Sequence, residues 1–166
     1  MEEKSILRKI ILTGLFAAIA VILSGIYFPV GPTKCFPFQH AINAVCGVLL
    51  GPWYAAAAAI IAGVIRNMLG TGTIFAFPGG IPGALVVGIV HRFWRKDYAA
   101  FTEPLGTGPI GASISAFIVA PWIGRSMPFL TFQIAFLVSS IPGCLLGFLV
   151  LRILRKTEAF KFTEIK

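Results

Sequence analysis

The chain has 166 residues, of which 57% are hydrophobic and only 12% are charged, with a mean hydropathy of +0.90 and a formal net charge of +8. A water-soluble domain needs about a quarter of its residues charged to cover its surface, so this composition excludes a soluble protein and implies a surface solvated by lipid. Several spanning helices of about 20 residues each use nearly the whole length, which predicts one membrane-embedded domain over residues 1–166 and no separate catalytic domain.

Glycine and proline residues divide the chain into six predicted helices. The first runs from Lys9 to Phe28 and ends before the sequence PVGP. It has no small-residue cleavage site and further apolar segments follow it, so we interpret it as a retained helix rather than a secretory signal. The predicted fold class is an all-α integral membrane protein, a six-transmembrane-helix bundle. The other five helices are predicted at Pro37–Leu50, Pro52–Leu69, Ile81–Trp94, Gly108–Trp122 and Pro128–Leu154.

The second and fourth predicted helices are short for a membrane span. Each has only about fourteen residues, roughly 21 Å of helix, against a hydrocarbon core of about 30 Å. Irregular backbone is tolerated at membrane depth only inside protein or around a cavity. Both helices follow stretches rich in glycine and proline, PVGP before the second and GTGTIFAFPGG before the fourth. We therefore expect a pocket on that side of the bundle, capped by an outer loop.

The basic residues predict the orientation of the bundle. An even number of crossings places both termini on one face, and that face receives eleven of the fourteen Lys and Arg residues. This bias predicts cytoplasmic termini in a multi-pass protein of the plasma membrane, and the net charge needs no nucleic acid to explain it. The eleven are Lys4, Arg8, Lys9, Arg92, Arg95, Lys96, Arg152, Arg155, Lys156, Lys161 and Lys166, and the opposite face keeps Lys34, Arg66 and Arg125.

The acidic residues all fall in the predicted cytoplasmic segments, so that no predicted span contains a carboxylate. Carriers coupled to protons or sodium usually keep an ionisable site near the membrane midplane, and we expect no such coupling here. The chain also has no GxxxxGK[ST] loop and therefore no means of hydrolysing ATP itself. The acids are Glu2, Glu3, Asp97, Glu103, Glu158 and Glu164.

The sequence offers no metal site, disulfide framework or catalytic constellation. His40 and His91 fall on opposite faces, and no acid joins either of them. The cysteines Cys35, Cys46 and Cys144 are odd in number and far apart, which favours buried apolar filler. Nothing resembles a nucleophile beside a base, so we expect neither an enzyme nor a cofactor.

Polar side chains in the predicted helices are candidates for ligand binding. Gln39, His40 and Asn43 share one broad face of the second helix because they are three or four residues apart. Either they form interhelical hydrogen bonds, each worth about 1 kcal/mol or less, or they line a pocket near the outer surface. Asn67 ends the third helix beside Arg66, which either snorkels to carbonyls or lipid phosphate or stands at the pocket rim.

Aromatic residues and further polar residues complete the predicted pocket. Phe75 and Phe77 lie in the glycine-rich loop, where they either fold over a flat ring or anchor the loop in lipid. Serines in membrane helices mostly bond to their own backbone or allow close packing, whereas a glutamine in a long apolar helix needs a partner. Amide and hydroxyl groups with aromatic walls predict a neutral pocket for a small uncharged heterocycle. The candidates in the last two helices are Ser113, Phe117, Gln133, Phe136 and Ser140.

Small residues on the first helix predict a close contact with another helix. Gly14 and Ala18 are four residues apart, with Ala17 beside them, and this spacing lets helix backbones approach closely. The alanine run at residues 55–59 of the third helix has the same quality. Each of these two sites serves either internal packing or the binding of an external partner. Such a partner would supply the ATP hydrolysis that this chain lacks.

Two stretches resemble the substrate-binding S components of energy-coupling factor (ECF) transporters. GPTKCFPFQHAINAVCGVLLGPWYA and IRNMLGTGTIFAFPGGIPGALVVG are similar to the ThiW branch, which is linked to the thiazole precursor of thiamine. Gly14 departs from the two alanines usual in the helix-one motif of these proteins. The resemblance implies a protein that binds hydroxyethyl-thiazole, a small neutral ring, from outside. It further implies docking on a transmembrane coupling protein with two ATPase subunits, and toppling in the membrane to release the ligand inward.

Two rival interpretations stay open. A self-sufficient channel or facilitator for small molecules needs no partner, although the sequence has no obvious internal repeat and no pore-lining polar stripe. A membrane-embedded enzyme or a purely structural subunit is disfavoured by the missing catalytic constellation. The leading prediction is the binding subunit of an ATP-driven importer.

Overall fold

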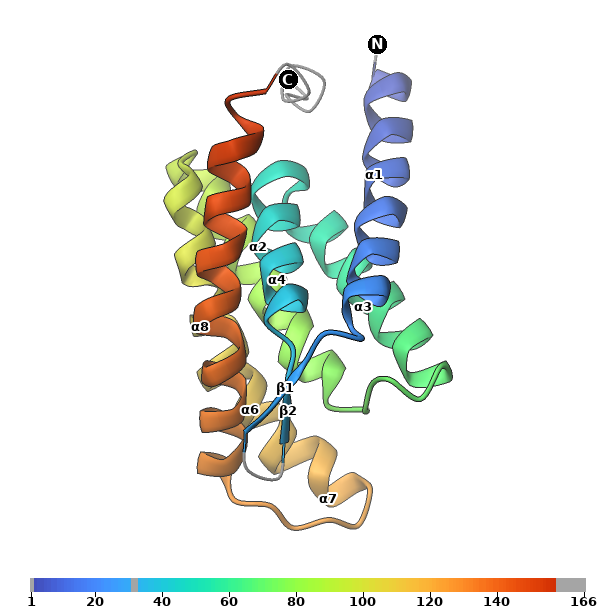
Figure 1. The fold of residues 1–166 in the computed structure, drawn as a ribbon, viewed down its shortest axis with the longest axis vertical. Coiled ribbons are helices and arrows are strands. Elements are labelled where there is room, and N and C mark those ends of the chain that lie inside the picture. The colour runs from blue at the N-terminus through green and yellow to red at the C-terminus, as the bar shows by residue number, and fades with distance from the viewer. Residues whose placement is uncertain (1, 31–32, 158–166) are drawn as a thin grey trace.

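The computed structural model describes residues 2–30 and 33–157, and most of them lie in helices (Figure 1). Four of the charged residues counted above, Glu158, Lys161, Glu164 and Lys166, lie outside the described residues, as do Gly31 and Pro32 of the predicted capping loop. In chain order the first elements are α1 (Glu2–Leu23), the strands β1 (Phe28–Val30) and β2 (Thr33–Cys35), α2 (Pro37–Leu50), α3 (Pro52–Met68) and α4 (Ala76–Trp94).

A fifth helical segment and α8 complete the described chain. The fifth segment begins as a 3₁₀ helix and continues through alternating α-helical and π-helical turns as far as Trp122. The first of the wider π-helical stretches contains three glycines and a proline, residues that disfavour a regular α-helix. The parts of this segment are η1 (Asp97–Thr102), α5 (Glu103–Leu105), η2 (Gly106–Gly111), α6 (Ala112–Ile114), η3 (Ser115–Val119) and α7 (Ala120–Trp122), and α8 spans Phe129–Leu154.

The predictions for α2, α3 and α8 are correct to within one residue. Gly51 separates α2 from α3 with a φ of +85°, a left-handed conformation that glycine adopts without a Cβ penalty. Pro37 and Pro52 then stand in the first turns of their helices, where a missing N–H leaves no hydrogen bond unmade. Local backbone chemistry therefore fixes these boundaries.

The predicted boundaries of the other three helices are wrong. The first helix begins before Lys9 and ends at Leu23, because the chain around Phe28 pairs instead with Cys35 in an antiparallel hairpin. The fourth begins at Ala76 rather than Ile81, so that half of the predicted glycine-rich loop is helical. Glycines at this end of α4 allow close approach of other side chains, since a Cβ at Gly80 would lie 2.7 Å from Gln39 Nε2.

The fifth helical segment begins at Asp97 rather than at Gly108. Pro104 stands in the first turn of α5, where proline is well tolerated, and the segment therefore continues the helix from η1. Gly106 and Gly111 press against the backbone carbonyls of Pro82 and Pro78 in α4, which leaves no space for a side chain at either glycine. Tertiary packing against α4 stabilises a helix that glycine content alone disfavours.

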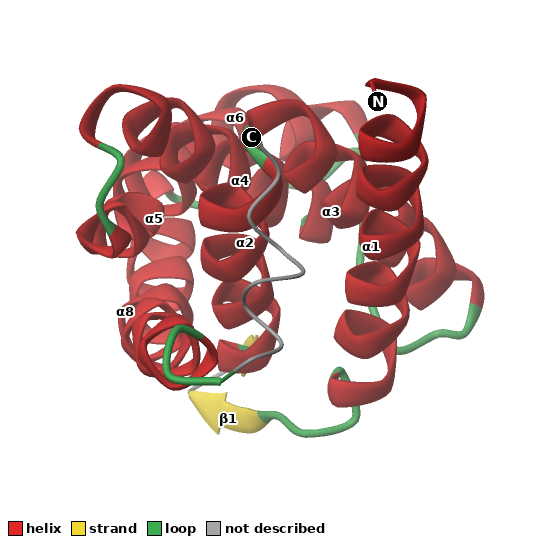
Figure 2. Ribbon diagram, turned by 90° about the horizontal axis from the view of Figure 1, so that it is seen from above, coloured by secondary structure: helices red, strands yellow, loops and turns green. Residues whose placement is uncertain are grey.

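Small residues form the interior of the bundle. Seen along the long axis, α2 and α4 lie centrally, with α1 and α3 on one side and α8 and the fifth segment on the other (Figure 2). A Cβ at Gly147 of α8 would lie 2.8 Å from the carbonyl of Ala41 in α2, which shows how closely these backbones approach. The alanine run of α3 belongs to this interior, since Ala55, Ala56, Ala58 and Ala59 are all buried.

The outer surface of the bundle is apolar. Side chains such as Ile22, Phe117 and Ile134 are more than half exposed, as expected where lipid rather than water surrounds the helices. Within the described residues, α1, α4, the segment from Asp97 to Trp122 and α8 are long and apolar enough to span a membrane, and α2 is a shorter apolar helix. The fold is therefore a helical membrane bundle, while the count of six crossings stays a prediction.

The start of α1 and the end of α8 lie at the same end of the molecule, and the hairpin lies toward the opposite end (Figure 1). At the first of these ends, the guanidinium of Arg155 forms an ion pair with Asp97 at the start of the fifth segment. We refer to the two ends as the terminal end and the hairpin end.

Candidate ligand-binding site

A cavity of about 560 Å³ opens at the hairpin end. Its walls come from β2 and the start of α2, from the end of α3 and the loop that leads into the start of α4, and from the start of α8 with the loop before it. This volume lies in the range of sites that enclose a small organic ligand. Short α2 and the irregular loops beside it therefore surround a cavity, as the sequence predicted.

The polar face of α2 divides between the cavity and the interior. Gln39 and His40 line the cavity and are both buried. Asn43 does not line it, and its Nδ2 donates a hydrogen bond of 3.1 Å to the carbonyl oxygen of Gly80 in α4. One face of α2 thus supplies both pocket lining and an interhelical hydrogen bond.

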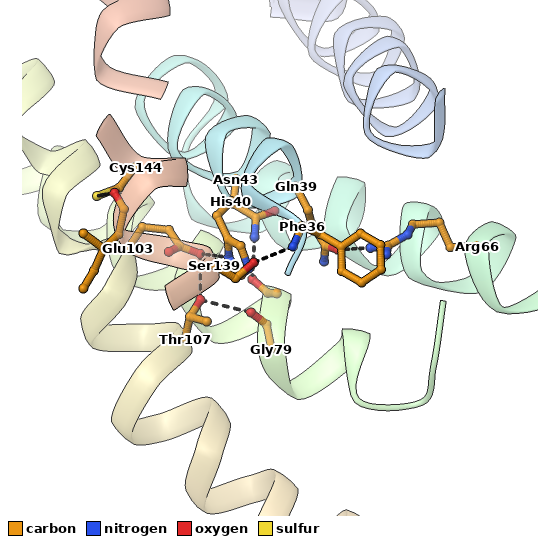
Figure 3. A network of polar contacts seen from close by, with 12 residues as sticks. Phe36, Gln39, His40, Asn43, Arg66, Gly79, Glu103, Thr107, Ser139 and Cys144 are labelled. Carbon is orange, nitrogen blue, oxygen red and sulfur yellow. Dashed lines mark hydrogen bonds and ion pairs between the residues drawn. The ribbon is translucent and has the colours of Figure 1, made fainter. Parts of the chain in front are cut away.

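A buried carboxylate lies behind the cavity wall (Figure 3). Glu103 is fully buried, and its Oε1 lies 2.8 Å from His40 Nδ1 and 2.6 Å from the hydroxyl of Thr107. The Thr107 hydroxyl also lies 3.0 Å from the carbonyl oxygen of Gly79. A carboxylate at Nδ1 fixes the orientation of the His40 ring and leaves Nε2 as the free ring nitrogen.

This network corrects two predictions from the sequence. Glu103 lies in a helix long and apolar enough to span the membrane, so the absence of carboxylates from the spans is wrong. An acid also joins His40, which the sequence analysis excluded. The sequence analysis assigned Glu103 to a charged segment outside the spans. The useful signal was that Glu103 directly precedes Pro104, a proline suited to the first turn of a helix, and that Thr107 follows four residues after Glu103.

Arg66 lies inside the protein and does not snorkel to the surface. Its side chain is only 1% exposed and lines the cavity. Nη1 donates a hydrogen bond to Gln39 Oε1, and the guanidinium carbon lies 4.3 Å from the centroid of the Phe36 ring (Figure 3). Its Nε and Nη2 have no hydrogen-bond partner among the described residues. The arginine is thus fixed at the cavity wall by one hydrogen bond and one cation–π contact.

Three aromatic rings form another wall of the cavity. Phe75, which precedes α4, lies 4.7 Å between ring centroids from Phe132, and Phe132 lies 6.0 Å from Phe136. Phe77, the second residue of α4, lies instead against α3, where a Cβ at Gly63 would meet its ring at 2.9 Å. The predicted pair of aromatics therefore contributes one ring to the cavity and one to helix packing.

The remaining predicted site residues lie outside the cavity. Asn67 donates to the carbonyls of Gly63 and Thr73 at 2.8 and 3.1 Å, and the Ser113 hydroxyl donates to the Pro109 carbonyl at 2.7 Å. Phe117 is 70% exposed and stacks on Phe129. Gln133 Oε1 and Ser140 Oγ are buried without a hydrogen-bond partner among the described residues.

Many residues that line the cavity were not predicted from the sequence, and neither was the positive charge of the lining. Lys34, Arg66 and Arg125 all line the cavity, whereas none of the described lining residues is acidic, so the prediction of a neutral lining is wrong. The signal was present, because these are the three cations assigned to the outer face. The other lining residues that were not predicted include Phe36, Thr71, Thr73, Ile123, Met127, Phe132 and Ser139.

The described residues contain no group of three His, Cys, Asp or Glu side chains placed to hold a metal ion. The three cysteines are free and buried, in agreement with a role as apolar filler. The cavity lining itself offers hydrogen-bonding groups, aromatic rings and cationic side chains.

The predicted docking residues of α1 do not all face the same way. Ala17 is buried in the interior cluster with Ala20 and Ala55. Ala18 is exposed, and a Cβ added at Gly14 would meet no atom within 4 Å. Gly14 and Ala18 therefore leave a shallow, small-residue strip on the outer surface of α1.

Comparisons with known proteins agree with these features. The family model for ThiW, described as a thiamine-precursor transporter protein, matches residues 10–157. Among solved structures, the S component for biotin from an ECF-type ABC transporter is similar with a TM-score of 0.61, with 22% identity over 98% of each chain. At this identity the likeness shows the fold alone, which is that of an S component. No curated protein sequence matches the chain significantly.

Proposed function

Since this chain belongs to the ThiW family of thiamine-precursor transporters, we propose that it is the substrate-binding S component of an ECF-type, ATP-dependent importer. The family and the fold make it a membrane transport protein and not an enzyme. A transmembrane coupling protein with two ATPase subunits supplies the energy in this proposal. The chain captures its ligand from outside and topples on that module to release it inward.

The position of the cavity carries the proposal. All of its described lining comes from the hairpin end, and its wall on α2 stops at His40. Behind His40 lie the bonded side chains of Glu103 and Thr107, followed by the alanine-rich interior. A cavity confined to one end suits capture of a ligand, whereas a self-sufficient channel needs a polar path between both ends.

The distribution of basic residues supports an outward-facing cavity. The excess positive charge lies at or near the terminal end, on residues Lys4 to Lys9 of α1 and on Arg152 to Lys156 at the end of α8 and just beyond it. By the positive-inside rule this end is cytoplasmic, and the hairpin end faces outward. The six helical segments then correspond to six crossings, with short α2 shielded by its neighbours.

The ligand in this proposal is hydroxyethyl-thiazole or a close derivative. A flat ring fits against Phe75, Phe132 and Phe136, while Gln39 and His40 offer polar groups from α2. Closure of the loop before α4 excludes water and strengthens each of these hydrogen bonds.

Phe75→Ala is expected to weaken binding of hydroxyethyl-thiazole to the purified chain by about tenfold, measured by isothermal titration calorimetry in detergent. The variant loses an aromatic contact worth about 0.5–1.5 kcal/mol together with part of the apolar wall. Phe77→Ala is the matched control, since this ring lies against α3 and outside the cavity. The proposed ring site is refuted if Phe77→Ala weakens binding while Phe75→Ala leaves it unchanged.

A further inference from the structure

A buried cation at the cavity wall has no acidic partner. Arg66 is 1% exposed, and within the described part of the chain the ion pairs join His40 to Glu103 and Arg155 to Asp97. Its two contacts, with Gln39 and the Phe36 ring, fix the guanidinium without neutralising its charge. Burial of an unpaired charge is costly, and such groups concentrate at functional sites.

One edge of this guanidinium is unused. Nε and Nη2 of Arg66 are buried and have no hydrogen-bond partner among the described residues. These two N–H groups form one side of the planar guanidinium, and that side binds a carboxylate or phosphate through two parallel hydrogen bonds. Arg155 uses the same edge in this protein, since its Nε and Nη2 both donate to the Asp97 carboxylate.

The surroundings of Arg66 favour a negatively charged ligand. Lys34 and Arg125, both exposed, line the same cavity, and none of the described lining residues carries a negative charge. The Glu103 carboxylate lies behind the wall and not in the lining, where its Oε1 contacts His40 and Thr107. Cations gathered in a cleft with apolar walls raise the local concentration of anions.

We propose that Arg66 is the anchor for an oxyanion of the ligand, and that the cavity prefers an acidic derivative of its heterocycle to the neutral alcohol. The oxyanion, a carboxylate or a phosphate ester, accepts hydrogen bonds from Nε and Nη2 while the ring contacts the Phe75 wall. This inference rests on the proposed function, because it assigns the charge of the ligand that the S component carries.

Calorimetric titration of the purified full chain tests the proposal with three thiazole probes. They are hydroxyethyl-thiazole, its phosphate monoester, and the analogue with a carboxymethyl group in place of the hydroxyethyl group. At least one acidic probe is expected to bind ten times more tightly than the alcohol or better, and the tighter of the two identifies the oxyanion. In Arg66→Met, affinity for that probe is expected to fall at least 50-fold, and at least ten times more than affinity for the alcohol, which loses only the support that Arg66 gives to Gln39.

Two further variants separate anion binding from a structural role. Arg66→Lys keeps the positive charge but cannot donate two parallel hydrogen bonds, so its affinity for the acidic probe is expected to lie between those of the wild type and Arg66→Met. Arg92→Met removes a cation from the opposite, terminal end of α4, so it changes the net charge equally and is expected to leave all three affinities unchanged.

Several results overturn the proposal. If wild-type protein binds the alcohol as tightly as both acidic probes, the cavity has no oxyanion site, although the proposed function stands. If Arg66→Met weakens all three probes equally, Arg66 only supports the cavity wall. If Arg66→Met does not fold, the affinities of the wild-type chain and of Arg66→Lys for the three probes still show whether the cavity has an oxyanion site. Failure of all three probes to bind the wild-type chain removes the proposed thiazole function as well.

Discussion

Replacing Ala18 with tryptophan, or Gly14 with leucine, is expected to abolish ATP-dependent uptake while ligand binding by the solitary chain is preserved. Helices in lipid associate through close backbone approach at small residues, so a bulky side chain on this strip blocks docking sterically. Ligand binding at the cavity should not change, because the strip lies on the outer surface of α1 and a Cβ added at Gly14 would meet no atom within 4 Å. The measurement pairs vesicle uptake with calorimetry on the same variants.

The control places the same bulk on a helix across the bundle. Ile141 of α8 is 56% exposed, and Figure 2 shows α8 on the side opposite α1, so Ile141→Trp should leave both uptake and binding intact. Normal assembly and transport by the α1 variants would show that docking uses another surface. The alanine run of α3 is not that surface, since most of it is buried.

Replacing Glu103 with alanine is expected to destabilise the folded protein by about 3 kcal/mol, because the buried groups that hydrogen-bond to its carboxylate are left unsatisfied. The variant leaves His40 Nδ1 and the Thr107 hydroxyl without the acceptor that they share. Thermal unfolding in detergent should show a melting temperature lower by roughly 10 °C. Ligand affinity should fall as well, because the His40 ring loses the contact that orients it at the cavity.

Two variants define what the Glu103 carboxylate contributes. Glu103→Gln keeps an oxygen acceptor of the same shape and should recover part of the lost stability. Glu3→Ala removes an exposed acid from α1 and should change the free energy of unfolding by about 0.5 kcal/mol or less. An unchanged melting temperature in Glu103→Ala would mean that the network contributes nothing to the fold.

Helix boundaries could be predicted from the sequence where local glycine and proline residues determine them. Gly51 and the prolines at 37 and 52 fix α2 and α3, and their boundaries were predicted to within one residue. The start of the fifth segment could not be predicted from the sequence, because its glycine-rich first half is helical only through packing. Gly106 and Gly111 are held in the helix by contact with the backbone of α4. Periodicity within one segment carries no information about such contacts.

The candidate site was predictable in location but not in charge. The short α2 and the loops around it indicated a cavity at the correct end, and Gln39, His40, Phe75 and Phe136 do line it. The position of Arg66 was ambiguous, because a helix-terminal arginine reaches either lipid phosphate or the interior with the same sequence context. Only the placement of Gln39 and Phe36 around its guanidinium distinguishes the two.

Uptake into sealed vesicles tests the central claim most directly, namely that this chain binds ligand but depends on an external module for transport. Labelled hydroxyethyl-thiazole and its phosphate ester are offered to vesicles that contain the chain alone or together with a coupling protein and two ATPases, with and without ATP inside. We expect the solitary chain to bind ligand without accumulating it, and uptake to require both the module and ATP. Uptake of either compound by the solitary chain without ATP would contradict the account and identify a self-sufficient facilitator.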